Sequence, residues 1–469
     1  MPAGELAMVL HTHMPYVEGF GTWPFGEEWL WEAAATSYVP LLRVLDGLGP
    51  EVSRTKLTLS LTPVLCDQLE APGALERCVA FLREIRPESH RLDIEELNAA
   101  GESNAVAELE RSADEYAAAA DRLERLVREG GLVRALGRHA TWTSAASHAI
   151  LPLLALDDAV DLQLQVGIDS YRHRFGDWGG GFWLPECAHA PWLNGMLIEA
   201  GIRGACIELT NVLGYGSELN LRPQKPSDGP ALLPIDRATI DLVWGEHGYP
   251  SRPPYRDYHR RTRYDHHVLA NDGSVYDYDR ARRQAGEDAR EFVTAVRGRL
   301  AMANGGLCIC AVDTELLGHW WYEGPVWLES VLNESERQGL ALTALDVDAI
   351  ARHSPVDMHI SESMHVTSWG SGSDLRTWSE PSVADLAWQA RDAELHAFLG
   401  GVNRSERALR ELLALQSSDW AFLAHRGWAG DYPRQRASGH AAQLSRALKG
   451  ETEEPHVRNL APYLELRYS

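Results

Sequence analysis

Short apolar runs that end in polar or aromatic residues recur along the chain, and a segment with helical spacing follows each of them. Residues 6–10 (LAMVL) end at a His-Thr-His triplet, and residues 307–312 (LCICAV) end at Asp313. Similar runs occupy 55–61, 131–136, 180–184 and 202–207. Runs of this length that alternate with helical patterns predict βαβ units around a parallel sheet. In barrels of such units the functional residues lie at the carboxyl ends of the strands.

Two segments depart from this alternation. Residues 87–129 are rich in Ala, Glu, Leu and Arg at helical spacing, which predicts a helical insertion between strands. Helical patterns also fill the chain after Pro381. We therefore expect an α/β barrel formed by residues 1–86 and 130–380, with the insertion at 87–129 and a C-terminal helical domain at 381–469.

Composition narrows the class of partner. The chain has 469 residues, 45% of them hydrophobic, and a formal net charge of -23. This charge argues against nucleic acid or an anionic membrane as partner and favours a neutral ligand. The first residues contain neither a basic segment nor an apolar stretch long enough for a signal peptide, so we expect a cytoplasmic protein. The six cysteines form no CxxC pair and are expected to be reduced core thiols.

Two carboxylates lie where strands are expected to end. Glu186 follows a proline and is flanked by Trp183 and Trp192, and Asp313 ends a much later apolar run. A barrel would bring both to one face, where paired carboxylates among aromatic rings suit the cleavage of a glycosidic bond. A single Glu beside a Trp is more often an ordinary surface carboxylate, but several such strand ends favour a site. If the pair acts with retention, the carboxyl groups should lie about 5 to 7 Å apart.

His11 and His13 are two residues apart at the end of the first run, so both can point the same way. They are favoured as donors and acceptors of hydrogen bonds to sugar hydroxyls, with a metal site as the alternative, since His-x-His is a plausible ligand pair. His148, in ASHAILPLL, is expected to open an apolar helix as a capping, core or site residue.

Several motifs, taken in order, resemble one family. They are HTHMPYV, GFGTWPFGEEWLWEA, SLTPVL, ASHAILPLL, FWLPECAHAPW, VWGEHGYP, VDTELLGHWWYEG, TSWGSG and LLALQSSDW. In this order they resemble glycoside hydrolase family 57, in particular its glucan branching enzymes. The resemblance covers nearly the whole chain.

The resemblance implies an incomplete (β/α)7 barrel that acts on an α-glucan such as amylose, amylopectin or glycogen, without metal or cofactor. It implies that Glu186 is the nucleophile and Asp313 the general acid/base. The residues that it places around the glucan are His11, His13, Trp23, His148, Trp244, Trp369, Trp378, Asp419 and Trp420. Trp320 and Trp321, beside Asp313, are further candidates for stacking against sugar rings.

The chain departs from the family in the connection between Glu208 and Trp244, which is roughly thirty residues shorter than in branching enzymes and retains Tyr215 as its only tyrosine. A family tyrosine after WLPECA is His189 here. A loop that closes over a site excludes water. We therefore expect branching with a substantial hydrolytic share; the alternatives are an α-amylase-like hydrolase, a 4-α-glucanotransferase or a metal-dependent deacetylase.

Overall fold

The computed structural model describes residues 4–357, 366–401, 405–451 and 456–465. Its centre is a parallel sheet whose strands run in the spatial order β7-β5-β4-β3-β2-β1-β8. These strands are β1 (Glu5–Thr12), β2 (Leu57–Leu61), β3 (Ala140–Ser144), β4 (Gly181–Trp183), β5 (Gly204–Ile207), β7 (Ala231–Pro234) and β8 (Leu307–Asp313). The sheet is the predicted incomplete (β/α)7 barrel.

The gap between the two outermost strands, β7 and β8, is narrowed by the chain that follows β7. The backbone N–H of Asp236 donates to the carbonyl of Ile309 in β8 at 2.8 Å. Helix α12 (Arg237–Trp244) then packs along β8 with Ile240 and Val243 buried. Three short strands complete the sheet: β6 (Gln224–Lys225), β9 (Ala341–Leu342) and β10 (Val356–Asp357).

The seven parallel strands of the barrel are buried on both faces, as parallel strands between helices are. Every residue of β2 is buried, and only the first residue of β1 is partly exposed. The helices of the barrel are α1 (Glu27–Ala33), α2 (Val39–Leu48), α3 (Pro50–Lys56), α4 (Pro63–Leu69), α5 (Ala74–Ala80), α8 (Leu132–Gly137), α9 (Asp157–Phe175), α10 (Asn194–Glu199), α11 (Thr210–Leu213), α13 (Tyr278–Met302), α14 (Gly324–Gln338), α15 (Val347–Arg352) and α16 (Arg376–Ser379).

One sequence expectation about strands is wrong, and one strand was missed. Residues 131–136 form most of helix α8, and the strand at this point of the barrel is the following ATWTS segment, β3. The apolar residues Leu132, Val133 and Leu136 are buried at helical spacing, so the pattern of this run fits one face of a helix as well as it fits a strand. Strand β7 is the strand that the sequence analysis missed.

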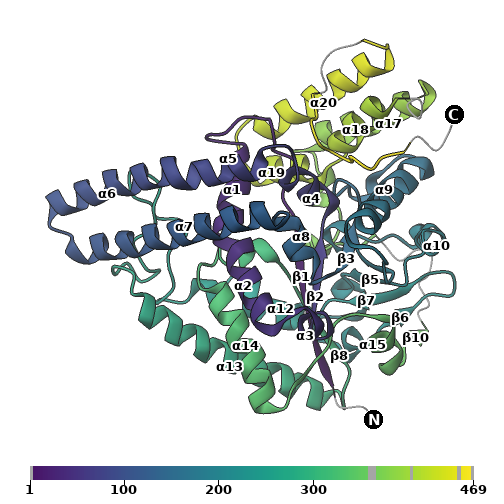
Figure 1. The fold of residues 1–469 in the computed structure, drawn as a ribbon. Helices are drawn as coiled ribbons and strands as arrows, with labels where there is room; N and C mark the ends of the chain where they lie inside the picture. Colours follow the sequence, from purple (N-terminus) through teal and green to yellow (C-terminus); the bar gives the residue numbers. More distant parts are fainter. Residues whose placement is uncertain (1–3, 358–365, 402–404, 452–455, 466–469) are drawn as a thin grey trace.

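The expected insertion is helical. Helices α6 (Arg86–Ala100) and α7 (Ser103–Glu129) form an antiparallel pair that extends away from the strands (Figure 1). The C-terminal segment contains α17 (Ala384–Leu399), α18 (Glu406–Leu415), α19 (Ser418–Arg426) and α20 (Tyr432–Leu448), which gather at one end of the barrel (Figure 1). The division of the chain into separate domains remains a prediction.

Hydrogen bonds join the C-terminal helices to the barrel. The carboxylate of Glu394 on α17 accepts bonds from the backbone N–H groups of Ala155 and Leu156 at 2.9 and 2.8 Å, just before α9. Asp67 on α4 accepts one from the backbone of Ala461 at 2.7 Å. The helical layer is therefore tied to two neighbouring parts of the barrel. None of the helices in the described part of the chain has the length and apolarity of a membrane span.

Candidate active site

The predicted site residues meet at the carboxyl ends of the strands. His11 in β1 is in register with Ser60 in β2 on one side and with Asp313 in β8 on the other. Glu186 follows β4 after one proline and one leucine. The charge of Asp313 acts on Glu186, so the two carboxyl groups share one electrostatic environment. The expected separation of their carboxyl groups remains a prediction.

Glu186 is held in an uncommon backbone conformation. Its φ is 58°, in the left-handed region that disfavours side chains with a Cβ, and Cys187 after it has a φ of 50°. The indole N–H of Trp369 donates to Oε2 of Glu186 at 2.6 Å, and the backbone N–H of Trp369 donates to the carbonyl of Glu186 at 2.9 Å. The turn thus aims the carboxylate, and Trp369 fixes it there.

Three histidines stack beside the carboxylates. The rings of His13 and His148 are 3.9 Å apart, and His11 lies between His148 and Trp183 at 5.0 and 4.5 Å. Nε2 of His11 and Nε2 of His148 are 3.0 Å apart, so one nitrogen donates and the other accepts. Contrary to expectation, His148 opens no apolar helix: it lies in the turn after β3 with a φ of 60°.

Helix α19 brings two polar side chains from the C-terminal layer into this stack. Nε2 of His13 lies 3.0 and 3.2 Å from the two carboxylate oxygens of Asp419, and Nδ1 of His148 lies 3.0 Å from the hydroxyl of Ser418. Both partners are in the first turn of α19, where a negative charge is favourable. Sequence reasoning found Asp419 but not Ser418, although the SSD triplet is a helix-start signal.

A further acid, Glu315, supports the site through hydrogen bonds. Glu315 is buried, and its Oε1 accepts from the hydroxyl of Tyr38 at 2.6 Å and from the backbone N–H of His13 at 3.1 Å. Burial and the neighbouring Asp313 raise the pKa of Glu315 well above its usual value. Glu315 thus positions the chain that carries His13. Sequence reasoning assigned it no role, because nothing in the DTELLGHWW motif shows which acid faces the substrate.

Burial dominates the electrostatics of the site. It raises the pKa of Glu186 to about 8, with a further rise from Asp313 and an opposing effect of the Trp369 N–H. Burial also raises the pKa of Asp313 to about 6; His13 opposes this rise and the charge of Asp419 adds to it. Burial and the neighbouring histidines hold the pKa of His11 and His148 well below the usual value. These two imidazoles are therefore neutral, and each can donate one hydrogen bond and accept another.

The predicted tryptophans fall into two groups. Trp23 and Trp244 are 64% and 50% exposed, and Trp320 and Trp369 are partly buried. The expectation that all seven offer a face to sugar does not fit the other three: Trp321, Trp378 and Trp420 are at most 2% exposed. These rings fill the core instead.

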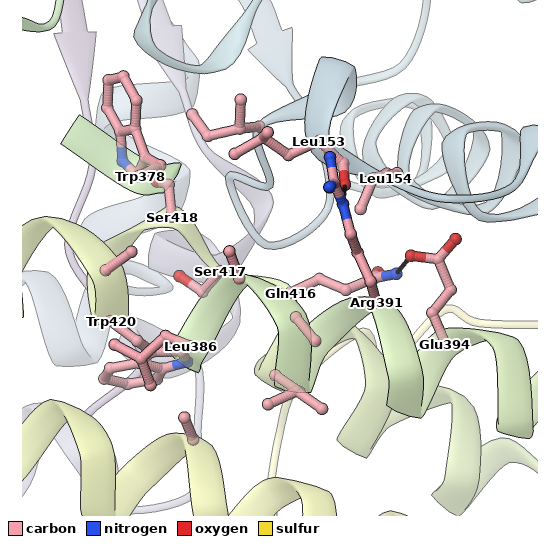
Figure 2. Close-up of a pocket in the computed structure, with 16 residues that line it drawn as sticks. Leu153, Leu154, Trp378, Leu386, Arg391, Glu394, Gln416, Ser417, Ser418 and Trp420 are labelled. Atoms are coloured by element: carbon pink, nitrogen blue, oxygen red, sulfur yellow. Dashed lines mark hydrogen bonds between the residues drawn. The ribbon is translucent and has the colours of Figure 1, made fainter. Parts of the chain in front are cut away.

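A small cavity lies between the barrel and the C-terminal helices. It has a volume of about 60 Å³ and separates Leu153 and Leu154 from helices α16 to α19 (Figure 2). Trp378 and Trp420 line it, together with Ser417 and Ser418, whereas neither Glu186 nor Asp313 does. The cavity is therefore a packing gap between the barrel and the helical layer, close to the support of His148.

One group in the described part of the chain has ligand atoms close enough for a metal ion: Glu411, His440 and His456, within 4.8 Å of one another. It lies in the C-terminal layer, apart from the site. The guanidinium of Arg436 donates to Nε2 of His440 at 3.0 Å, which places the proton of His440 on Nδ1, 2.8 Å from Glu411. Both ring nitrogens of His440 are therefore already hydrogen-bonded, and a metal ion would need one of them as a ligand.

An incomplete parallel barrel with paired acids, neutral imidazoles and indole rings at its strand ends is the arrangement of a glycoside hydrolase. Residues 136–365 match glycosyl hydrolase family 57, and residues 401–461 match the family described as 1,4-alpha-glucan branching enzyme, C-terminal. The chain belongs to glycoside hydrolase family 57.

Similar proteins share this architecture. A probable 1,4-alpha-glucan branching enzyme of Mycobacterium tuberculosis is 31% identical over 494 aligned positions, covering 93% of this chain and 90% of that protein. The 1,4-alpha-glucan branching enzyme of Thermococcus kodakarensis is 30% identical, covering 94% of this chain and 73% of that protein. The crystal structure of a branching enzyme from Pyrococcus horikoshii superposes with a TM-score of 0.84 at 28% identity, over 98% of this chain and 93% of that one.

Proposed function

We propose that this protein is a 1,4-α-glucan branching enzyme that works with retention. Glu186 attacks the anomeric carbon of an α-1,4-linked glucan, while Asp313 gives a proton to the leaving 4-oxygen. Asp313 then removes a proton from the 6-hydroxyl of an acceptor chain, which attacks the glycosyl-enzyme and releases Glu186. The convergence of Glu186 and Asp313 at the strand ends of a family 57 barrel carries the proposal, and the matches to branching enzymes name the acceptor.

The remaining site residues have supporting roles in this reaction. His11, His13 and His148 bind sugar hydroxyls at the cleavage point, and Asp419 keeps the proton of His13 on Nε2. Trp23, Trp244, Trp320 and Trp369 offer faces to sugar rings. Two of the buried tryptophans act indirectly: Trp378 packs against Gly370, beside Trp369, and Trp420 anchors α19 by donating to the carbonyl of Ala414 at 2.8 Å.

A finer part of the proposal concerns water. The segment after β5 is held down against its neighbours: the hydroxyl of Tyr215 donates to Asp241 on α12 at 3.0 Å, and Arg299 on α13 donates to the carbonyls of Gly216 and Ser217. A segment held in this way leaves the site without a lid, and water competes with the acceptor for the glycosyl-enzyme. We therefore expect hydrolysis beside branching.

The roles of the two acids can be separated by azide. Glu186→Ala and Asp313→Ala should each lose several orders of magnitude in rate on amylose while still binding it. With azide, Glu186→Ala should form a β-glycosyl azide, because azide enters on the face that Glu186 occupied. Asp313→Ala should form an α-glycosyl azide, because azide then attacks the glycosyl-enzyme. The same anomer from both variants, or rates close to those of the unaltered protein, would contradict the assignment.

The azide reactions should run equally well in EDTA, because no step uses a metal. Loss of activity on chelation that zinc restores would favour the metal-dependent carbohydrate hydrolase instead. The cytoplasmic location remains a prediction from the sequence.

A further inference from the structure

One face of helix α19 leads from the active site to the protein surface. Asp419, Phe422 and Arg426 are three and four residues apart, so they lie on the same side of the helix. Asp419 contacts His13 inside the site. From Asp419 to Arg426 the helix rises by about 10 Å. The face that begins at the catalytic histidines therefore continues outward past Phe422 to Arg426.

An exposed tryptophan extends this face. Gly427 ends α19 in a left-handed conformation, and Trp428 follows with 62% of its surface exposed. The ring of Trp428 meets that of Phe422 edge-on at 5.7 Å. The guanidinium of Arg426 lies 5.5 Å from the ring of Phe422 and 5.8 Å from that of Trp428. We call Phe422, Arg426 and Trp428 the α19 platform.

Two observations connect the platform with the glucan site. The positive charge of Arg426 acts on the Glu186 carboxyl, so the platform lies within electrostatic reach of the nucleophile. The segment after the platform also contacts the loop that carries Trp23: Tyr432 packs against Phe25, with ring centres 5.7 Å apart, and its hydroxyl donates to the carbonyl of Phe20 at 3.5 Å. The exposed Trp23 and Trp428 thus belong to segments in contact with each other.

We propose that the α19 platform is a further α-glucan subsite, which binds the chain several glucose units away from the cleavage point. This inference rests on the proposed function. The indole and phenyl faces suit the apolar faces of glucose rings, and the guanidinium supplies donors for hydroxyl groups. A neutral ligand of this kind needs no charged partner. Because a distant subsite is filled only by a long chain, its binding energy should favour long substrates over short ones.

The test compares Trp428→Ala with Trp388→Ala. Trp388 on α17 is 67% exposed and also has an arginine, Arg391, 5.8 Å from its ring. Within the described residues, no hydrogen bond or ring contact joins Trp388 to the site, which makes it a matched control. KM and kcat are measured on amylose and on a series of maltooligosaccharides of increasing length.

We expect Trp428→Ala to raise KM for amylose by about tenfold, with kcat/KM on the shortest accepted oligosaccharide unchanged. Trp428→Phe should recover part of the loss, and Trp388→Ala should match the unaltered protein. An equal effect of Trp428→Ala at all chain lengths, no effect at all, or the same effect from Trp388→Ala would overturn the subsite.

Failure of the proposed function would look different. In that case the unaltered protein would leave both amylose and oligosaccharides unchanged. Retention of the protein in native gels that contain amylose would then decide the subsite by itself. Weaker retention of Trp428→Ala, but not of Trp388→Ala, would support the platform as a glucan-binding surface, and equal retention of all three proteins would overturn it.

Discussion

Glu186 and Asp313 share one proton in the range between their raised pKa values, about 6 and about 8. Because the two acids interact, these values belong to the pair and not to one residue. The indole N–H of Trp369 donates to Glu186 and so favours the negative charge there. Even with this bond the pKa of Glu186 stays the higher of the two, so the proposed reaction requires the proton to move to Asp313 before Glu186 attacks.

The activity should therefore have a bell-shaped dependence on pH, with kcat/KM falling below about pH 6 and above about pH 8. Below the lower value both acids are protonated and the nucleophile is lost; above the upper value both are ionised and the acid is lost. Initial rates on amylose, measured from roughly pH 4 to pH 10 so that both pKa values are spanned, would determine this profile. A profile that stays flat from roughly pH 5 to pH 9, about one pH unit beyond each pKa value, would show that this pair does not control the rate.

Among single residues, the sequence identified the candidate carboxylates but not the contacts that hold them. Glu186 and Asp313 could be found because each ends an apolar run. The left-handed backbone of Glu186 and the bond from Trp369 could not, because both depend on the pairing of residues 186–189 with residues 367–369. The buried Trp321 shows the converse: a tryptophan next to a site in sequence can still point into the core.

At the scale of elements, α19 completes a site that the barrel begins. Its first turn supplies Ser418 to His148 and Asp419 to His13. Strand ends could be predicted from their apolar runs, with residues 131–136 and the missed strand β7 as the exceptions. The docking of α19 could not, because a contact between residues 406 positions apart leaves no local pattern.

Loss of the Asp419 charge should shift the pH profile. Asp419 raises the pKa of both Glu186 and Asp313, so Asp419→Asn should move both limbs of the profile to lower pH. The variant should also lose roughly 10- to 100-fold in kcat, since a hydrogen bond to a charged group is removed. Ser418→Ala is the control, because it removes the bond to His148 without a change in charge. Limbs that stay in place in Asp419→Asn would show that this carboxylate acts only by packing.

At the scale of the whole molecule, the incomplete barrel and the helical layer both contribute side chains to the site, and the segment after β5 is hydrogen-bonded to α12 and α13. The incomplete barrel itself was predicted through the family resemblance, since apolar runs alone do not show how many strands close a sheet. The tethering of Tyr215 and of residues 216–217 could not be predicted, because it depends on Asp241 and Arg299, which are distant in sequence.

A glycosyl-enzyme that is open to solvent is attacked by water as well as by an acceptor. Branching wins only to the extent that the acceptor is bound and oriented.

The most direct test of this account is the ratio of new α-1,6 branch points to new reducing ends when the protein acts on amylose. Reducing ends are counted before and after enzymatic debranching, for the unaltered protein and for a chimera with a longer, tyrosine-bearing loop in place of residues 214–228. We predict that the unaltered protein forms branch points together with many reducing ends, and that the ratio rises in the chimera. An unchanged ratio in the chimera would contradict the role of the lid, and a complete absence of branch points would contradict the proposed branching activity itself.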